Sequence, residues 1–346
     1  MTKVLKPVIL KSQSNLGFFM ALNKERQFSL ENPFLNTHFI SIEQITSRGQ
    51  IEYLFRIADG MRQAVEQRKQ LYLLRDSTVA ILFYQPSSRT FTSFQAATQR
   101  LGCQRIVAIP GMDAYSSAVK GESLPDTIRT IEQTTAANII ILRHPDDNSS
   151  EIAAQYATVP VINAGSGRKE HPTQAVLDLY TIQQELGTLD GLNVVMLGDL
   201  KNGRTIKSLG LLLAVVAPST KILLVSPPQL AAPPDFVKKL KAKGANVEET
   251  SNLEEVLGQA DVLYVTRIQK EWFESEGEYQ RVKGSYVITP ELMRGAKEKM
   301  IVMHPFPRVD EIDPRFDSDP RAAYFRQMRA GLYTRMALMA AILGKA

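Results

Sequence analysis

Short apolar runs alternate with longer amphipathic stretches along the chain from Ile40 onward. Apolar runs rich in β-branched and aliphatic residues indicate buried strands, and the amphipathic stretches between them indicate the crossover helices of a parallel sheet. We predict a first set of strands at 78–84, 105–110, 138–142 and 159–163, and a second set at 193–197, 221–225, 245–249, 261–265 and 300–304. The pattern therefore predicts an α/β protein with two doubly wound parallel-sheet domains.

Two predicted helices indicate how the domains are joined. One lies between the two sets of strands, with proline at its first position and Gly187 as its stop, and the other ends the chain and is expected to pack back on the first domain. The first residues show no clear period and are expected to lie outside the core. The expected organisation is an N-terminal extension at 1–35, a first domain at 36–170 completed by a C-terminal helix within 321–346, a bridging helix at 171–187, and a second domain at 188–320.

Composition narrows the class of protein. A chain of 346 residues is longer than most single domains, which favours two domains that share a cleft. No apolar run approaches the roughly 18 residues of a membrane span, and the single cysteine, Cys103, excludes an internal disulfide and favours a cytoplasmic location. The formal charge of +5 is spread along the chain, so small anionic substrates explain it better than nucleic acid does. We expect neither a nucleic-acid nor a membrane partner.

A polar segment after the first predicted strand is the strongest local signal for a ligand site. Ser87, Ser88 and Arg89 follow that strand and open a predicted helix. Hydroxyls and free backbone N–H groups at a helix start bind anions, and a guanidinium donates two hydrogen bonds to phosphate oxygens. Taken alone, two serines at a helix start could also be a simple helix cap.

Other polar side chains stand at further strand and helix ends of the first half. Arg143 follows a predicted strand, and His171 and Gln174 stand at the start of the bridging helix. Because the carboxyl ends of parallel strands line the ligand crevice, Arg143 should point to it. His171 could polarise a carbonyl oxygen and Gln174 could bind an amide. The alternatives are a solvated loop charge for Arg143 and a helix cap for His171.

Candidate ligand-binding residues also stand at strand and helix ends of the second half. Segment 198–205 follows a strand and precedes a helix but lacks the G-x-G-x-x-G spacing, so Arg204 is a better candidate for clamping a carboxylate than for a dinucleotide site. Arg267 and Gln269 follow the next-to-last strand, and prolines flank Phe306 after the last one. Arginines at the ends of several strands and helices predict one pocket for small anions.

These segments, in this order, resemble the aspartate carbamoyltransferase catalytic chain of the aspartate/ornithine carbamoyltransferase superfamily. The resemblance covers roughly 39–343. Its motifs are Ser-Ser-Arg-Thr at 87–90, Lys-Gly-Glu-Ser at 120–123, Arg-His-Pro at 143–145, His-Pro-Thr-Gln at 171–174, Gly-Asp-Leu-Lys at 198–201 with Gly-Arg-Thr at 203–205, Thr-Arg-Ile-Gln-Lys at 266–270, and His-Pro at 304–305 with Pro-Arg-Val-Asp-Glu at 307–311. Seven motifs in register argue strongly against chance.

The resemblance implies an activity: transfer of the carbamoyl group from carbamoyl phosphate to the amino group of L-aspartate, in de novo pyrimidine (UMP) biosynthesis. The implied catalytic residues are Arg89, Thr90, Lys120, Arg143 and His171. The implied substrate-binding residues are Ser87, Ser88, Ser116, Gln174, Arg204, Arg267, Gln269, Phe306 and Pro307. Ser116 and Lys120 would reach in from a neighbouring subunit, which implies a homotrimer with shared active sites. No metal or organic cofactor is implied.

The sequence departs from the family pattern at three positions, and three rival functions would require other features than it has. Ser88, Asn202 and Phe306 stand where the family usually has threonine, tyrosine and leucine. An ornithine enzyme would need acidic or apolar recognition of a cation and a cysteine after the last strand, and segment 304–308 has no cysteine. A catalytically silent homologue would be expected to have lost a charged site residue, and an NAD-dependent oxidoreductase would need its glycine fingerprint. Regulatory chains or other pathway enzymes are left open as partners.

Overall fold

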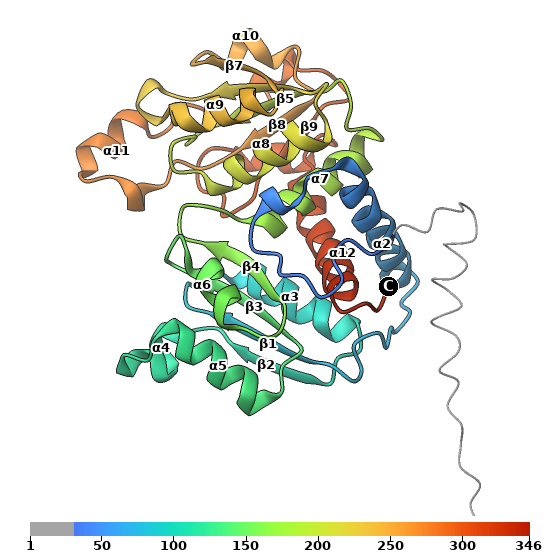
Figure 1. The fold of residues 1–346 in the computed structure, drawn as a ribbon. Helices are drawn as coiled ribbons and strands as arrows, with labels where there is room; N and C mark the ends of the chain where they lie inside the picture. The colour runs from blue at the N-terminus through green and yellow to red at the C-terminus, as the bar shows by residue number, and fades with distance from the viewer. Residues whose placement is uncertain (1–30) are drawn as a thin grey trace, which may run out of the picture.

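The computed structural model describes residues 31–346, which contain two sheets, one in each half of the molecule (Figure 1). The first sheet consists of β1 (Thr78–Phe83), β2 (Arg105–Ile109), β3 (Ile139–His144) and β4 (Val161–Ser166), in the order β2-β1-β3-β4. The second consists of β5 (Asn193–Leu197), β6 (Lys221–Val225), β7 (Asn246–Thr250), β8 (Val262–Val265) and β9 (Ile301–Met303), in the order β7-β6-β5-β8-β9. All neighbouring strands are parallel. The predicted fold class is confirmed.

Helices connect the strands in both halves. The first half contains α2 (Arg48–Glu66), α3 (Ser88–Arg100), α4 (Met112–Tyr115), α5 (Leu124–Thr135) and α6 (Ser149–Tyr156), and the second half contains α8 (Arg204–Val216), α9 (Pro234–Ala242), α10 (Leu253–Leu257) and α11 (Glu276–Val282). The 3₁₀ helices are η1 (Ile42–Gln44), η2 (Ser117–Lys120), η3 (Pro228–Leu230), η4 (Lys270–Trp272), η5 (Leu292–Gly295) and η6 (Pro314–Ser318). No helix among the described residues is long and apolar enough to cross a lipid bilayer.

The bridging helix α7 (Pro172–Leu186) has the bounds that the sequence predicts. Pro172 occupies the first turn, where its missing N–H breaks no intrahelical hydrogen bond. Gly187 ends the helix in the left-handed region, with φ of +74°. Most of its side chains are buried, because it runs between the two halves and packs against α8 and α12. This helix therefore sets how the two sheets face each other.

The last helix, α12 (Tyr324–Ile342), begins three residues later than predicted. The preceding residues pair with β9 instead: the Val302 N–H donates to the Arg321 carbonyl at 2.8 Å, and the Ala323 N–H donates to the Val302 carbonyl at 2.9 Å. Strand pairing thus replaces the first predicted helical turn. The helix then packs against α2, α3 and α7, so the end of the chain returns to the first half (Figure 1).

The hydrophobic core starts earlier in the chain than the sequence predicts. Residues 1–30 of the expected extension lie outside the described residues, but Phe34 is buried in the main core. Its ring centre lies 6.2 Å from that of Phe39 and 6.3 Å from that of Tyr53. Asn32 donates from Nδ2 to a carbonyl of α12 at 2.7 Å. The predicted end of the extension is therefore a few residues too late, because one aromatic residue in a short polar stretch produces no detectable period.

Phe34→Ala is expected to lower the free energy of unfolding by about 3–5 kcal/mol, since it removes a large buried ring and leaves a cavity. Leu35→Ala is the matched control: this side chain is 50% exposed, so its loss should change stability by less than about 0.5 kcal/mol. Denaturant unfolding followed by circular dichroism measures both. Small and equal effects would contradict the burial of Phe34.

Candidate active site

A cavity of about 1050 Å³ lies between the two halves, at the carboxyl ends of the strands. It is lined by residues of β3 and by the segments that follow β1, β4, β5, β8 and β9. Twelve of the fourteen residues predicted for the site line it: Ser87, Ser88, Arg89, Thr90, Arg143, His171, Gln174, Arg204, Arg267, Gln269, Phe306 and Pro307. Residues far apart in the sequence therefore share a single space.

Positive charge dominates this cavity. Seven of the described lining side chains are arginines, and none of the described ones is an aspartate or glutamate. Burial, together with the charges of Arg204 and Arg89, holds the pKa of Arg143 well below its ordinary value. Burial also lowers the pKa of Arg204 to about 10, although Asp147 acts in the opposite direction. Because arginine keeps its proton in proteins, these lowered pKa values mark an unfavourable electrostatic energy that a bound anion would relieve.

The start of α3 forms one wall of the cavity. Ser87 is the N-cap residue, but its side chain makes no capping hydrogen bond, so the simple cap interpretation is not supported. Ser88, Arg89 and Thr90 follow on the first turn, where backbone N–H groups have no intrahelical acceptor. Arg89 lies with its Cζ 5.9 Å from the centre of the Phe306 ring. Burial and the nearby Arg267 lower the pKa of Arg89.

Arg143 and Arg204 come together over the end of β4. The strand β3 ends two residues later than predicted, so Arg143 is its penultimate residue, and it donates from Nη1 to the Ala164 carbonyl at 3.3 Å. Arg204, on the first turn of α8, donates from Nη1 to the Gly167 carbonyl at 2.6 Å. Gly165 lies between them with φ of +118°, and a Cβ there would stand 2.9 Å from Arg143 Nη1. Only glycine lets both guanidinium groups approach this turn.

His171 precedes α7 and is held as a neutral imidazole. Its side chain is buried and makes no helix-capping hydrogen bond, so the capping alternative is not supported. Burial, followed by the charges of Arg204, Arg143 and Arg335, lowers the pKa of His171 well below its ordinary value. Within residues 31–346, the buried Nδ1 atom has no hydrogen-bond partner. A neutral imidazole has one N–H donor, which suits it to hydrogen-bond a carbonyl oxygen.

Gln174 is oriented by a buried carboxylate that the sequence does not single out. Asp178, one turn further along α7, accepts from Gln174 Nε2 at 2.8 Å. It also accepts from the Tyr264 hydroxyl of β8 at 2.7 Å and from Gln327 Nε2 of α12 at 2.7 Å. Asp178 therefore ties the side chain that faces the cavity to the second sheet and to the last helix.

The segment after β9 is fixed by His304. Its Nδ1 accepts from the Phe306 N–H at 2.8 Å, so the proton of the neutral ring is on Nε2, which lies 2.6 Å from Glu311 Oε1. The His304 N–H donates to Gln327 Oε1 at 2.9 Å. The Phe306-Pro307 peptide bond is cis. These contacts set the positions of the backbone carbonyls of Phe306 and Pro307, two residues that the resemblance implies for substrate binding.

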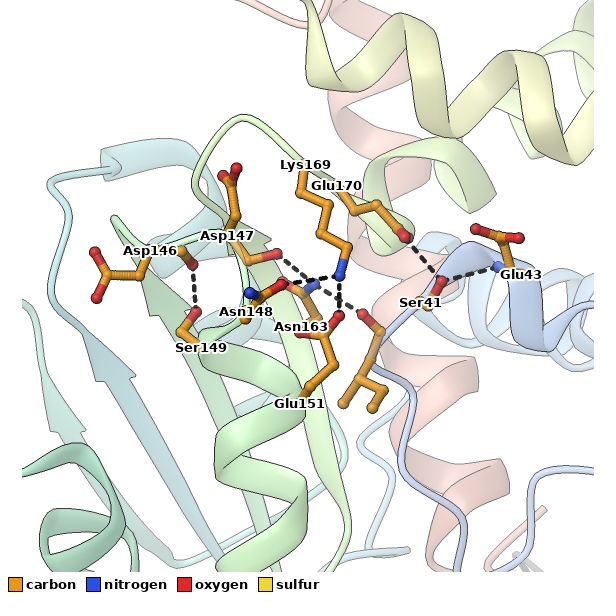
Figure 2. A network of polar contacts seen from close by, with 12 residues as sticks. Ser41, Glu43, Asp146, Asp147, Asn148, Ser149, Glu151, Asn163, Lys169 and Glu170 are labelled. Carbon is orange, nitrogen blue, oxygen red and sulfur yellow. Dashed lines mark hydrogen bonds and ion pairs between the residues drawn. The ribbon is translucent and has the colours of Figure 1, made fainter. Parts of the chain in front are cut away.

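The turn that leads from β4 into His171 is anchored on both sides, as Figure 2 shows. Lys169 pairs with Glu151 and donates to Asn148 Oδ1 at 3.2 Å. The Glu170 carboxylate accepts from the Ser41 hydroxyl at 2.8 Å. The residues on either side of the turn are thus held by contacts with α6 and with the segment before η1.

Arg335 is a fifth site arginine that sequence reasoning missed. It lies on α12, is buried, lines the cavity and donates from Nη1 to Ser93 Oγ at 2.7 Å. Burial lowers its pKa to about 10, while Asp178 acts in the opposite direction. Its signal in the sequence is a lone charge within the long apolar part of the last helix. Such a charge is rarely buried unless it is paired.

Two predicted residues do not line the cavity. Ser116 and Lys120 lie on the segment formed by α4 and η2, where Lys120 is exposed. The Ser116 hydroxyl donates to the Met112 carbonyl at 2.5 Å and accepts from the Ala118 N–H at 3.2 Å. Within one chain these two side chains are therefore not brought together with the other twelve.

Two doubly wound domains meet around a shared cationic cavity, which is an arrangement suited to small anionic ligands. Residues 37–184 match the aspartate/ornithine carbamoyltransferase, carbamoyl-P binding domain, and residues 190–342 match the aspartate/ornithine carbamoyltransferase, Asp/Orn binding domain. The chain belongs to the aspartate/ornithine carbamoyltransferase family.

Individual relatives agree with this assignment. The chain is 45% identical to the multifunctional protein CAD of Squalus acanthias over 91% of its own length, but it spans only 14% of that protein. It is 45% identical to the aspartate carbamoyltransferase catalytic subunit of Thermococcus gammatolerans, over 86% of this chain and 95% of that one. Aspartate transcarbamoylase from Trypanosoma cruzi, solved with carbamoyl phosphate and aspartate, is 42% identical and superposes with a TM-score of 0.83, over 90% of this chain and 96% of that one. The predicted resemblance is confirmed.

Asp178 should make stability depend on pH. Burial raises its pKa from an ordinary 3.8 to about 7, so in this window the folded protein binds more protons than the unfolded one and the stability of the wild type falls as pH rises. Asp178→Asn still offers an oxygen to both glutamines but does not titrate. The difference in free energy of unfolding, variant minus wild type, should increase by up to about 4 kcal/mol between about pH 4 and pH 7 and stay constant at higher pH. Urea unfolding across this range measures it, and a constant difference would contradict the assignment.

Proposed function

We propose that this chain catalyses the aspartate carbamoyltransferase reaction of de novo pyrimidine biosynthesis. In this reaction the carbamoyl group of carbamoyl phosphate moves to the amino group of L-aspartate, which gives N-carbamoyl-L-aspartate and phosphate. The observation that carries the proposal is the single cavity in which arginines of both halves meet His171 and Gln174. Family membership and the ligands named for the Trypanosoma cruzi neighbour support the same reaction.

The first half is proposed to bind carbamoyl phosphate. Its phosphate would lie at the start of α3, where Ser87, Ser88, Arg89 and Thr90 offer hydroxyls, backbone N–H groups and a guanidinium, with Arg143 on the other side. Charge-assisted hydrogen bonds contribute roughly 1.5–3 kcal/mol each, so a few of them fix a small dianion. The repulsion among the arginines would be reduced at the same time.

The carbamoyl group would lie between α7 and the segment after β9. The neutral His171, with Thr90 and Arg143, would donate to the carbonyl oxygen, while Gln174 and the backbone carbonyls of Phe306 and Pro307 would hold the amide. The neutral amine of aspartate attacks the carbonyl carbon, and the negative oxygen of the tetrahedral intermediate is stabilised by these donors. The C–O bond to phosphate then breaks, and the leaving phosphate takes the proton that the amine gives up.

The second half is proposed to bind aspartate. Arg204, Arg267 and Gln269 would donate to its two carboxylates. The charge of the cavity discriminates between substrates: the side-chain cation of ornithine would face arginines without an acidic residue among the described lining side chains. A cation in that place would be strongly disfavoured, which makes aspartate the better substrate.

Ser116 and Lys120 are proposed to complete the site of a neighbouring copy in a homotrimer. Their place outside the cavity of their own chain and the exposure of Lys120 fit this arrangement. We also propose a cytoplasmic location. The multifunctional relatives, of which this chain spans about a seventh, raise other pathway enzymes as partners, and a regulatory chain is a further possible partner.

Arg89→Ala should lower the rate of carbamoylaspartate formation by about 100-fold or more, because it removes a cation that binds the transferring group. Arg100→Ala, at the far exposed end of the same helix, is the control and should keep the wild-type rate. Phosphate release is measured with aspartate, ornithine and N-acetylornithine side by side. Preference for either ornithine compound, or full activity of Arg89→Ala, would overturn the proposal.

Shared sites predict complementation between inactive variants. Arg89→Ala and Lys120→Ala should each be inactive alone, but in randomly mixed trimers about a quarter of the sites combine an intact Arg89 with an intact Lys120 of the neighbour. The activity of a mixture that has been dissociated and reassociated should therefore approach about a quarter of that of the wild type. If the mixture stays inactive while mixed wild-type subunits recover, Lys120 does not act across subunits.

A further inference from the structure

A guanidinium and an indole meet at the exposed rim of the cavity. Arg168 lies between β4 and α7, in the first half, and Trp272 ends η4, in the second half. The Arg168 Cζ atom is 4.4 Å from the centre of the Trp272 ring, and both residues line the cavity. A cation at this distance from an indole face is attracted by the electron-rich ring. The pair therefore bridges the two halves at the solvent-exposed edge of the cavity.

Trp272 also contacts a residue of the proposed aspartate site. Its indole Nε1–H donates to Gln269 Oε1 at 3.3 Å, and its backbone N–H donates to the Gln269 carbonyl at 3.1 Å. With its amide oxygen occupied in this way, Gln269 keeps its NH₂ group available for an acceptor. A carboxylate is such an acceptor. If the Gln269 amide were turned the other way, its oxygen would face the carboxylate and repel it.

The Arg168 side of the contact is firmly held. Its backbone N–H donates to Asp147 Oδ1 at 2.6 Å, and the preceding Gly167 carbonyl accepts from Arg204 at 2.6 Å. Gly167 has φ of +41°, and a Cβ there would lie 1.8 Å from Asp147 Oδ1, so the turn is closely packed. Lys169 is fixed in the same network (Figure 2). The backbone of Arg168 therefore belongs to a closely packed turn, whereas the Trp272 side chain that it contacts is 38% exposed.

We propose that Arg168 and Trp272 are positioning residues: the stacked guanidinium fixes the indole, and the indole fixes the amide of Gln269 for one carboxylate of a dicarboxylate substrate. This inference rests on the proposed function, because it assigns part of the aspartate site. Neither residue needs to touch the reacting atoms. Unlike an ordinary pair on a protein surface, Arg168 and Trp272 line the cavity and belong to different halves, and Trp272 donates a hydrogen bond to Gln269.

Fluorescence gives a direct readout, since Trp272 is the only tryptophan of the chain. In wild type with saturating carbamoyl phosphate, titration with succinate, which has the two carboxylates of aspartate but no amine, should change the emission of Trp272. Arg168→Ala should shift the emission of the free protein to longer wavelength, because the indole becomes more exposed to water. It should also raise the succinate concentration at half-saturation by about 3- to 10-fold.

Steady-state kinetics tests whether the stack acts on aspartate binding. Arg168→Ala and Trp272→Ala should each raise KM for aspartate about 3- to 10-fold and leave kcat within about 2-fold. The double variant should be no worse than Trp272→Ala alone, because Arg168 is proposed to act only through the indole. Arg168→Lys, which keeps a cation, should restore part of the loss. Arg56→Ala removes a guanidinium 5.4 Å from the Tyr53 ring, outside the cavity, and should match the wild type.

The outcomes separate the two proposals. If wild type forms no carbamoylaspartate, the proposed function fails, and the emission of Arg168→Ala still reports whether the stack exists in solution. If wild type is active but Arg168→Ala has unchanged emission and unchanged KM, the positioning role is wrong. Additive effects in the double variant would also contradict it, since the two residues would then act separately.

Discussion

The burial of several arginines beside one cavity is the constraint on which the rest of this structure depends. Arg143, Arg204 and Arg335 are largely removed from water, and the pKa of each is lowered by burial. Buried charges destabilise a folded protein unless other groups of the protein pair with them. Here the partners are backbone carbonyls at the end of β4 and two carboxylates, Asp147 and Asp178, which stand outside the lining of the cavity.

The fold explains how this arrangement is maintained. Parallel strands end at one edge of each sheet, so residues at their carboxyl ends face the space between the halves. The bridging helix α7 and the last helix α12 hold the halves together through Asp178, which accepts hydrogen bonds from Gln174, Tyr264 and Gln327. Positive charge that is fixed in this way favours the binding of anions. Burial, together with the charges of the nearby arginines, keeps His171 neutral.

Much of the fold and several of the cavity residues were predictable from the sequence, because the patterns that indicate them are local. Strand 78–84 and the helix at 172–186 follow from apolar runs and from proline and glycine, and Arg143 and Arg204 follow from their places at strand and helix ends. The family motifs then ordered these residues into one site. The shared cavity agrees with that order, whereas the role of each residue still rests on the proposal.

The remainder depends on contacts between distant segments, which no local pattern contains. Asp178 is important because Tyr264 and Gln327 reach it from other elements. Arg335 does carry a local signal, the lone charge in an apolar helix, but its place at the cavity follows only from the folding of α12 back over it. Phe34 belongs to the core only because Phe39 and Tyr53 enclose it.

If the converging arginines form an anion site, a bound anion should stabilise the folded protein. The most direct measurement is denaturant unfolding at 25 °C and constant ionic strength, with chloride replaced stepwise by inorganic phosphate. The free energy of unfolding should rise with the logarithm of phosphate concentration, by about 2.7 kcal/mol at 100 times the dissociation constant. Arg143→Ala should largely abolish the rise. No rise in the wild type, or an equal rise in the variant, would contradict the existence of this anion site.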